Sequence, residues 1–189
     1  YDRVERDYVR ARGRGRRRPS FPGYGAGRKR PMAAPAQRLT MEDLIPAVAS
    51  VVAGESDMIA NMANIAAMIF EALPDLNWAG FYIWKEDQLV LGPFQGRMAC
   101  TRIPLGRGVC GTVARDRRTL IVPDVHAFAG HIACDAASAS EIVVPVMADG
   151  RLLGVLDIDS PICDRFSGDD RIMLEKIASL LVRASADTA

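Results

Sequence analysis

The sequence predicts one α+β domain built on a mostly antiparallel sheet. Helical and strand patterns follow one another in the order α-α-β-β-α-β-β-β-α. Strands that run consecutively between flanking helices favour antiparallel pairing. A chain of 189 residues, of which 49% are hydrophobic, can bury one substantial core. We therefore expect a single folded domain.

A basic segment without a hydrophobic period precedes this domain. Residues 1–31 contain eleven Lys or Arg and three acids, whereas residues 32–189 contain thirteen and twenty. A composition dominated by Arg, Gly and Pro predicts disorder. Met32 offers a start site, so we prefer to interpret residues 1–31 as upstream sequence without a function. Two other interpretations, nucleic-acid binding and an organelle transit peptide, are less favoured. We expect a disordered tail at 1–38 and the domain at 39–186.

The apolar residues and the cysteines indicate the compartment. No hydrophobic run reaches the roughly 20 residues that span a bilayer, and the chain lacks the apolar core of a secretory signal at its beginning. We expect a soluble, cytoplasmic protein without a membrane partner. Its four cysteines are too few for a disulfide scaffold, and in a reducing compartment such cysteines bind metals, catalyse or are buried.

Two helices open the domain. Gly54 is expected to end the first, Ser56 to cap the second, and Pro74 to mark the end of the second. Core residues of the second helix recur at helical spacing: Ile59, Met62, Ala63, Ala66, Ile69, Phe70 and Leu73.

Strands and a short helix follow. We expect strands at 78–84, 89–94 and 120–122, and a polar loop at 126–140. The glycine-rich turn at 106–111 lacks the Lys-Ser/Thr ending of a phosphate loop, so its glycines indicate tight backbone geometry before a short helix.

A hairpin and an amphipathic helix close the domain. The hairpin extends over 141–159, and Ser167 can cap the helix. Apolar residues fall on one side of this helix: Ile172, Met173, Ile177, Leu180 and Leu181.

The register of the hairpin decides which acids share a face. Asp157 and Asp159 are two residues apart and project to the same side of a strand. A two-residue turn pairs Asp157 with Ile142 and places both acids over an apolar face. A three-residue loop with Gly150 in the left-handed region pairs Asp157 with Glu141 instead. The hydrophobic pattern favours this second register, which gathers three carboxylates in one patch.

Such a patch has chemical consequences. Two aspartates at this spacing are on their own more typical of a solvated strand face. Three carboxylates held together cannot all ionise easily, so one keeps a proton near neutral pH unless a cation arrives. The patch therefore suits an ammonium ligand.

No two cysteines form a Cys-x-x-Cys pair. The four are Cys100, Cys110, Cys134 and Cys163. We considered a zinc site formed by His126, His131, Cys134 and Cys110. The first three have ligand-like spacing, but zinc sites usually have two close-spaced pairs of ligands, and the second pair is missing. We therefore expect no metal. We expect Cys163 to be a buried, inert thiol.

Several segments together carry a resemblance to a known family. They are Asn77-Trp78-Ala79-Gly80-Phe81-Tyr82, Gly92-Pro93-Phe94-Gln95-Gly96, Gly106-Arg107-Gly108-Val109-Cys110-Gly111, His131-Ile132-Ala133-Cys134-Asp135, Ser140-Glu141-Ile142-Val143-Val144-Pro145 and Leu156-Asp157-Ile158-Asp159. Residues 39–185 resemble the free methionine-R-sulfoxide reductases of the GAF-domain superfamily. The resemblance implies a GAF fold with helices on one face of the sheet and a ligand pocket on the other. It also implies a homodimer packed through helices, a free amino-acid substrate, no cofactor, and thioredoxin as the reductant.

The resemblance assigns roles to residues of this chain. Trp78 and Tyr82 match aromatic residues that contact the substrate methyl group. Three residues match the acidic pocket: Glu141, Asp157 and Asp159. By the same match, Cys134 is the nucleophile, Cys100 the main recycling cysteine, and Cys110 a third redox-active cysteine.

These roles are chemically coherent. A thiolate on Cys134 would attack the sulfoxide sulfur, a protonated carboxyl group would protonate the departing oxygen, and methionine would leave. The resulting sulfenic acid could condense with the Cys100 thiol. Two other functions stay open: a GAF module that senses a small ligand without chemistry, and a nucleic-acid binder that uses the basic tail.

Overall fold

The computed structural model describes residues 39–128, 130 and 137–186. The helices are α2 Leu44–Val52, α3 Met58–Ala72, α4 Gly108–Asp116 and α5 Gly168–Ala186, with a 3-10 turn η1 at Val125–Ala127. The strands are β1 Trp78–Lys85, β2 Gln88–Gly96, β3 Arg102–Pro104, β4 Leu120–Val122, β5 Ser140–Ala148 and β6 Arg151–Ser160. Three predictions lie outside the described residues: those for the basic tail, His131 and Cys134.

The strands form a six-stranded sheet in the order β3-β2-β1-β6-β5-β4. Every pairing between them is antiparallel, which confirms the predicted α+β class. The prediction omitted β3, which pairs with the first three residues of β2. Only the middle one of its three residues, Ile103, is buried, so no alternating pattern marks this strand in the sequence.

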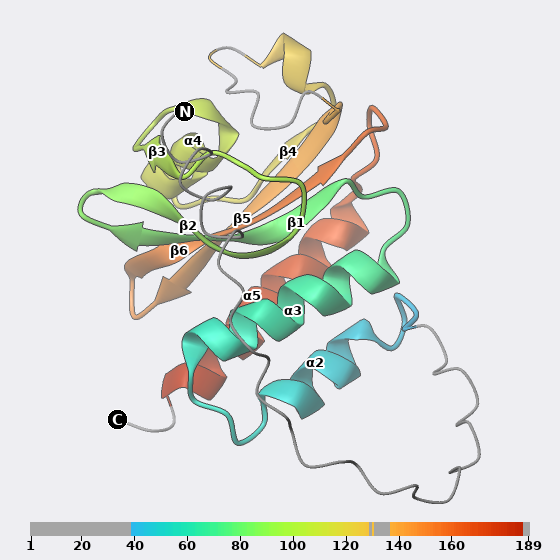
Figure 1. The fold of residues 1–189 in the computed structure, drawn as a ribbon, viewed down its shortest axis with the longest axis vertical. Helices are drawn as coiled ribbons and strands as arrows, with labels where there is room; N and C mark the ends of the chain where they lie inside the picture. Colours follow the sequence, from blue (N-terminus) through green and yellow to red (C-terminus); the bar gives the residue numbers. More distant parts are fainter. Residues whose placement is uncertain (1–38, 129, 131–136, 187–189) are drawn as a thin grey trace, which may run out of the picture. The chain divides into compact units, whose positions relative to one another are not determined.

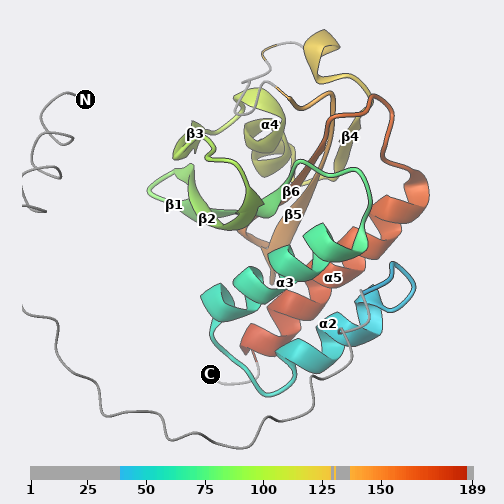
Figure 2. The same cartoon turned by 45° about the vertical axis from the view of Figure 1, so that its right-hand side comes forward.

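The helices divide between the two faces of the sheet. Helices α3 and α5 cover one face, with α2 packed against these two helices, and α4 lies on the other face (Figure 1, Figure 2). The larger hydrophobic cluster lies between the three helices and the sheet and includes Ile142, Val144 and Ile158. A smaller cluster lies under α4 and includes Val143. No helix in the described part of the chain is both long and apolar enough to cross a membrane.

Capping residues determine where two of these helices begin. Asp57, and not the predicted Ser56, caps α3 by accepting a hydrogen bond from the backbone N–H of Ala60 at 2.8 Å. At α5 the prediction is confirmed. The hydroxyl of Ser167 accepts from the N–H of Asp170, and the Asp170 carboxylate accepts from the N–H of Ser167.

The hairpin between β5 and β6 differs from its predicted register. A two-residue turn connects the strands, so Ala148 pairs with Arg151, and the predicted three-residue loop is wrong. Two residues after Arg151, Leu153 has no partner and forms a bulge, which shifts all later pairs. As a result Glu141 lies opposite Asp159, and not opposite Asp157.

The predicted faces are nevertheless confirmed. Side chains alternate between the two faces along each strand. A two-residue turn alone would place Asp157 and Asp159 on the face opposite to Glu141, and the one bulged residue returns them to the face of Glu141. Asp157 pairs with Val143 and shares a face with Glu141 and Asp159. The three carboxylates therefore lie on the α4 side of the sheet, and the apolar residues between them pack against the other helices.

Candidate functional site

Three aromatic rings form one wall of the site. Trp78 and Tyr82 are four residues apart on β1 and therefore project to the same face. Their ring centroids are 5.9 Å apart, and the Trp78 ring also stacks on Phe94 of β2 at 5.4 Å. Trp78 and Tyr82 are 2% and 1% exposed. Phe94 was not among the site residues predicted from the sequence, although it falls within one of the segments that carry the family resemblance.

A glycine makes the close packing of these rings feasible. Gly80 lies between Trp78 and Tyr82 on β1 and pairs with both Phe94 and Asp157 on its neighbouring strands. A Cβ atom at position 80 would collide with the Cβ of Phe94 and with the Trp78 ring. The absence of a side chain at this position therefore lets the rings stack above the sheet.

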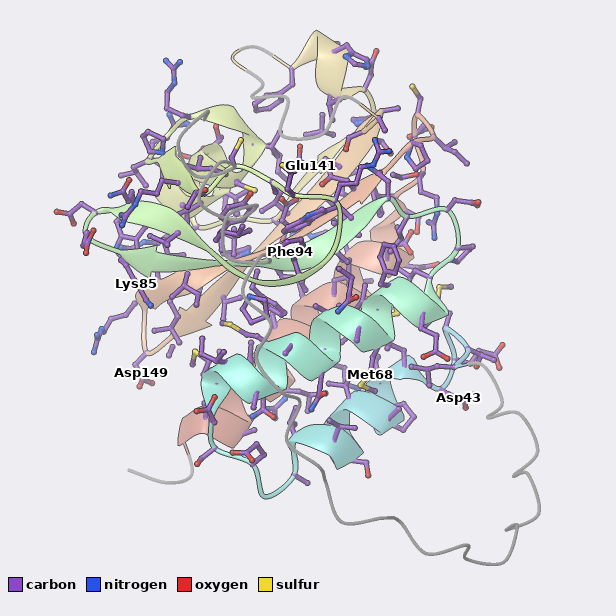
Figure 3. The ribbon with its side chains drawn as sticks, viewed as in Figure 1. Asp43, Met68, Lys85, Phe94, Glu141 and Asp149 are labelled. Atoms are coloured by element: carbon purple, nitrogen blue, oxygen red, sulfur yellow. The ribbon has the colours of Figure 1, made fainter. Side chains whose placement is uncertain are left out.

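The carboxylates form a second wall beside the aromatic rings. Glu141 comes from β5, and Asp157 and Asp159 come from β6. Glu141 and Asp157 are each 6% exposed. Trp78 pairs directly with Asp159 across β1 and β6, so the acidic and aromatic walls share one face of the sheet. Figure 3 shows Glu141 near one end of β5, and Asp149 at the hairpin turn beyond its other end.

Cys110 joins this cluster from α4. Its sulfur lies 3.8 Å from Oε1 of Glu141. The turn before α4 is tight, because the N–H of Gly106 donates to the carbonyl oxygen of Gly111 at 2.7 Å. A Cβ atom on Gly111 would collide with the carbonyl oxygen of Pro104. The glycines thus have the backbone role that the sequence predicts, and they bring the first turn of α4 close to the sheet.

Burial dominates the protonation of the cluster. Desolvation and then the charges of Asp157 and Asp159 raise the pKa of Glu141 well above its usual range. Burial raises the pKa of Asp157 to about 6, although hydrogen bonds with Cys110 and Glu141 oppose this rise. Burial and then the charges of Asp157 and Glu141 also raise the pKa of Cys110. These effects outweigh the helix N-terminus, which by itself would lower the pKa of the thiol. Both shifts favour the protonated forms of Glu141 and Cys110.

Tyr82 is also held in one protonation state. Burial, followed by the charge of Asp157, raises the pKa of its phenol. The hydroxyl therefore stays neutral at any physiological pH and can donate a hydrogen bond within the site.

The other described cysteines lie in different surroundings. Cys100 is disulfide-bonded, whereas Cys110 and Cys163 are free thiols. Cys163 is exposed, contrary to the prediction of a buried thiol. It lies in the turn that follows β6, where no helix or strand covers it.

One group of side chains in the described ranges offers metal-ligand atoms close together. It consists of Cys110, Glu141 and Asp157, whose donor atoms all lie within 4.8 Å of one another. This group differs from the zinc set considered from the sequence. Among that set, His126 is exposed in η1 while Cys110 is buried.

Comparisons with known proteins identify the family. The family model described as GAF domain matches residues 60–184. The chain is 56% identical over 134 residues to Protein YtsP of Bacillus subtilis, covering 70% of this chain and 82% of that protein. It is 50% identical over 139 residues to free methionine-R-sulfoxide reductase of Escherichia coli, covering 74% and 84%. The chain belongs to the GAF-domain family of free methionine-R-sulfoxide reductases.

A solved structure of the family agrees in fold. The free methionine-R-sulfoxide reductase of Neisseria meningitidis, determined in complex with its substrate, is 47% identical. The match covers 76% of this chain and 87% of that one, with a TM-score of 0.74. The fold is thus the GAF fold that the sequence resemblance implies.

The structure gathers most of the residues that the sequence singled out. Six described ones lie on one face of the sheet or in the helix above it: Trp78, Tyr82, Cys110, Glu141, Asp157 and Asp159. Cys100 follows the end of β2 and is half-buried. Cys134 lies outside the described residues.

Proposed function

We propose that this protein reduces free methionine-R-sulfoxide to methionine. The observation that carries the proposal is the pairing of an aromatic wall with a carboxylate wall on one face of the sheet. The identity to the Escherichia coli reductase supports it. A free amino acid with a methylated sulfoxide presents a cation at one end and an apolar methyl group at the other.

The two walls would bind the two ends of this substrate. Glu141, Asp157 and Asp159 would hold the ammonium group, which also relieves the repulsion among these clustered carboxylates. Trp78 and Tyr82 would contact the S-methyl group, because sulfur and methyl groups pack favourably against aromatic rings. A substrate without an ammonium group would lose the first set of contacts.

We propose that Cys134 is the nucleophile. Its thiolate would attack the sulfoxide sulfur while a protonated carboxyl group donates a proton to the oxygen. The new sulfur–sulfur bond would then break as the oxygen passes to the cysteine sulfur, and methionine would be released. The cysteine sulfur is oxidised to a sulfenic acid as the substrate sulfur is reduced. Glu141 suits the role of proton donor, because it is buried beside two other carboxylates.

A second thiol would complete the cycle. We propose that the Cys100 thiol condenses with the sulfenic acid, forming a disulfide and releasing water. The disulfide-bonded state of Cys100 supports this role, as does the free state of Cys110. A dithiol protein such as thioredoxin would then reduce the disulfide by thiol exchange.

We also propose an oligomeric state and a cellular location for the enzyme. Exposed apolar side chains on α2, α3 and α5, namely Val51, Ile59 and Ile172, support a homodimer packed through its helices. We propose a cytoplasmic location, where thioredoxin is available as reductant.

The test is turnover of free methionine-R-sulfoxide beside its N-acetylated form. We expect release of methionine from the free amino acid and poor reaction of the acetylated one, because the amide nitrogen carries no charge. A GAF module that only senses a ligand would bind the free sulfoxide and release no methionine. Equal rates on both forms would remove the carboxylates from the binding role.

A further inference from the structure

We propose that Cys110, Glu141 and Asp157 form a binding site for a thiophilic divalent cation such as Zn²⁺ or Cd²⁺. One donor atom from each side chain lies within 4.8 Å of the other two. The three side chains are buried and come from α4, β5 and β6, three packed elements that hold them in place. The site is built from one thiol and two carboxylates, and each of these groups can bind zinc.

An unpartnered oxygen in the cluster points to a ligand. Oδ1 of Asp157 is buried and accepts no hydrogen bond within the described part of the chain. Buried polar atoms in proteins nearly always have a partner, because leaving one unpaired costs free energy. A cation at the centre of the cluster would give this oxygen a partner.

The separation of two of the donor atoms is close to that around a tetrahedral ion. Bonds of about 2.3 Å to sulfur and about 2.0 Å to oxygen place two tetrahedral ligands about 3.5 Å apart. The sulfur of Cys110 and Oε1 of Glu141 are 3.8 Å apart. A shift of a few tenths of an ångström would therefore bring both atoms to bonding distance, and the fourth position would stay open to water.

The donor set also selects the kind of cation. Thiolate sulfur favours soft or borderline ions. Mg²⁺ and Ca²⁺ need six or more oxygen ligands, which three side chains of this composition do not supply. As the metal bonds form, the Cys110 thiol releases its proton to solvent, and so does the Glu141 carboxyl group where it is protonated. On the proposed function, the ion would also compete with the substrate ammonium group for Glu141 and Asp157.

Titration of the oxidised protein with Cd²⁺ tests the site. In this form Cys100 is in its disulfide, and the free thiols in the described ranges are Cys110 and Cys163. We expect a thiolate-to-cadmium charge-transfer band in the ultraviolet that saturates at one ion per chain. The band should be retained in the control Cys163→Ser and lost in Cys110→Ser. Mg²⁺ should neither produce the band nor displace Cd²⁺.

A second variant tests the carboxylate ligand. Asp157→Asn keeps the thiol and the side-chain shape but removes a charged ligand, so we expect cadmium affinity to fall by about tenfold or more. Circular dichroism establishes that each variant is folded. A band that persists in Cys110→Ser, an unchanged affinity in Asp157→Asn, or no band in the parent protein would overturn the proposal. Because the readout needs no turnover, its failure is distinct from a failure of the reductase activity.

Discussion

The indole N–H of Trp78 donates a hydrogen bond to the carbonyl oxygen of Arg97, 3.1 Å away. Arg97 precedes Cys100 by three residues, so this bond ties the aromatic wall to the segment that carries the proposed resolving thiol. On the proposed function, substrate binding and disulfide formation would therefore share this side chain.

Replacing Trp78 by Phe should separate these two roles. Trp78→Phe keeps an aromatic ring but removes the hydrogen bond, which contributes about 1 kcal/mol. We expect the first release of methionine to persist, while disulfide formation and steady-state turnover slow by roughly fivefold. Phe94→Leu is the control, because it alters the stack and leaves the Arg97 contact. Equal slowing of the recycling step in both variants would show that the hydrogen bond has no positioning role.

The three candidate redox thiols should differ in single turnover. We expect Cys134→Ser to abolish even the release of methionine in the absence of reductant, because a serine hydroxyl cannot form the sulfenic acid. Cys100→Ser should keep that first release and lose most of the thioredoxin-coupled turnover. Quenched single-turnover assays measure both. If Cys134→Ser releases stoichiometric methionine and Cys110→Ser releases none, Cys110 is the nucleophile.

The buried carboxylates should make folding stability depend on pH. Burial raises the pKa of Asp157 to about 6. At pH values between the ordinary pKa of an aspartate and about 6, the folded chain therefore keeps a proton on this group that the unfolded chain has released. Stability is therefore greatest below about pH 4 as far as this group is concerned, and it falls as the pH rises through about 6. A shift of about two units corresponds to roughly 3 kcal/mol.

Asp157→Asn should remove this loss. We expect the variant to become more stable than the parent as the pH is raised from about 4 to about 7. Urea unfolding in the presence of a chelator measures the difference, with Asp169→Asn at the exposed start of α5 as the control. Parallel pH profiles for the parent and Asp157→Asn would show that this carboxyl group is not desolvated.

Position 80 should tolerate no side chain. In Gly80→Ala the new Cβ would overlap Phe94 and the Trp78 ring, and overpacking of this kind costs about 1–3 kcal/mol. We expect a lower denaturation midpoint and weaker substrate binding. Gly168→Ala is the matched control, because a Cβ there meets no atom within 4 Å. A midpoint for Gly80→Ala equal to that of the control would contradict the packing.

The basic tail should be dispensable for activity. Every residue proposed for the site lies at or after Trp78. We expect a protein that begins at Met32 to keep the turnover of the full chain in a steady-state assay. A large loss of turnover would assign the tail a role in catalysis or assembly.

Much of the fold follows from periodicity within single segments. Helical spacing locates α3 and α5, and alternation places Asp157 on the same face as Asp159 because side chains in a strand repeat every two residues. Trp78 and Tyr82 share a face for the same reason. The site face was therefore predictable, whereas β3 was too short to show any period.

The residues on each face of each element follow from local patterning along the chain. How these sets of residues meet is a property of the folded chain. The bulge at Leu153 places Glu141 opposite Asp159, because pairing between strands depends on backbone hydrogen bonds that no periodicity encodes. The burial of Cys110 beside Glu141 and the exposure of Cys163 likewise depend on which distant elements pack over each thiol.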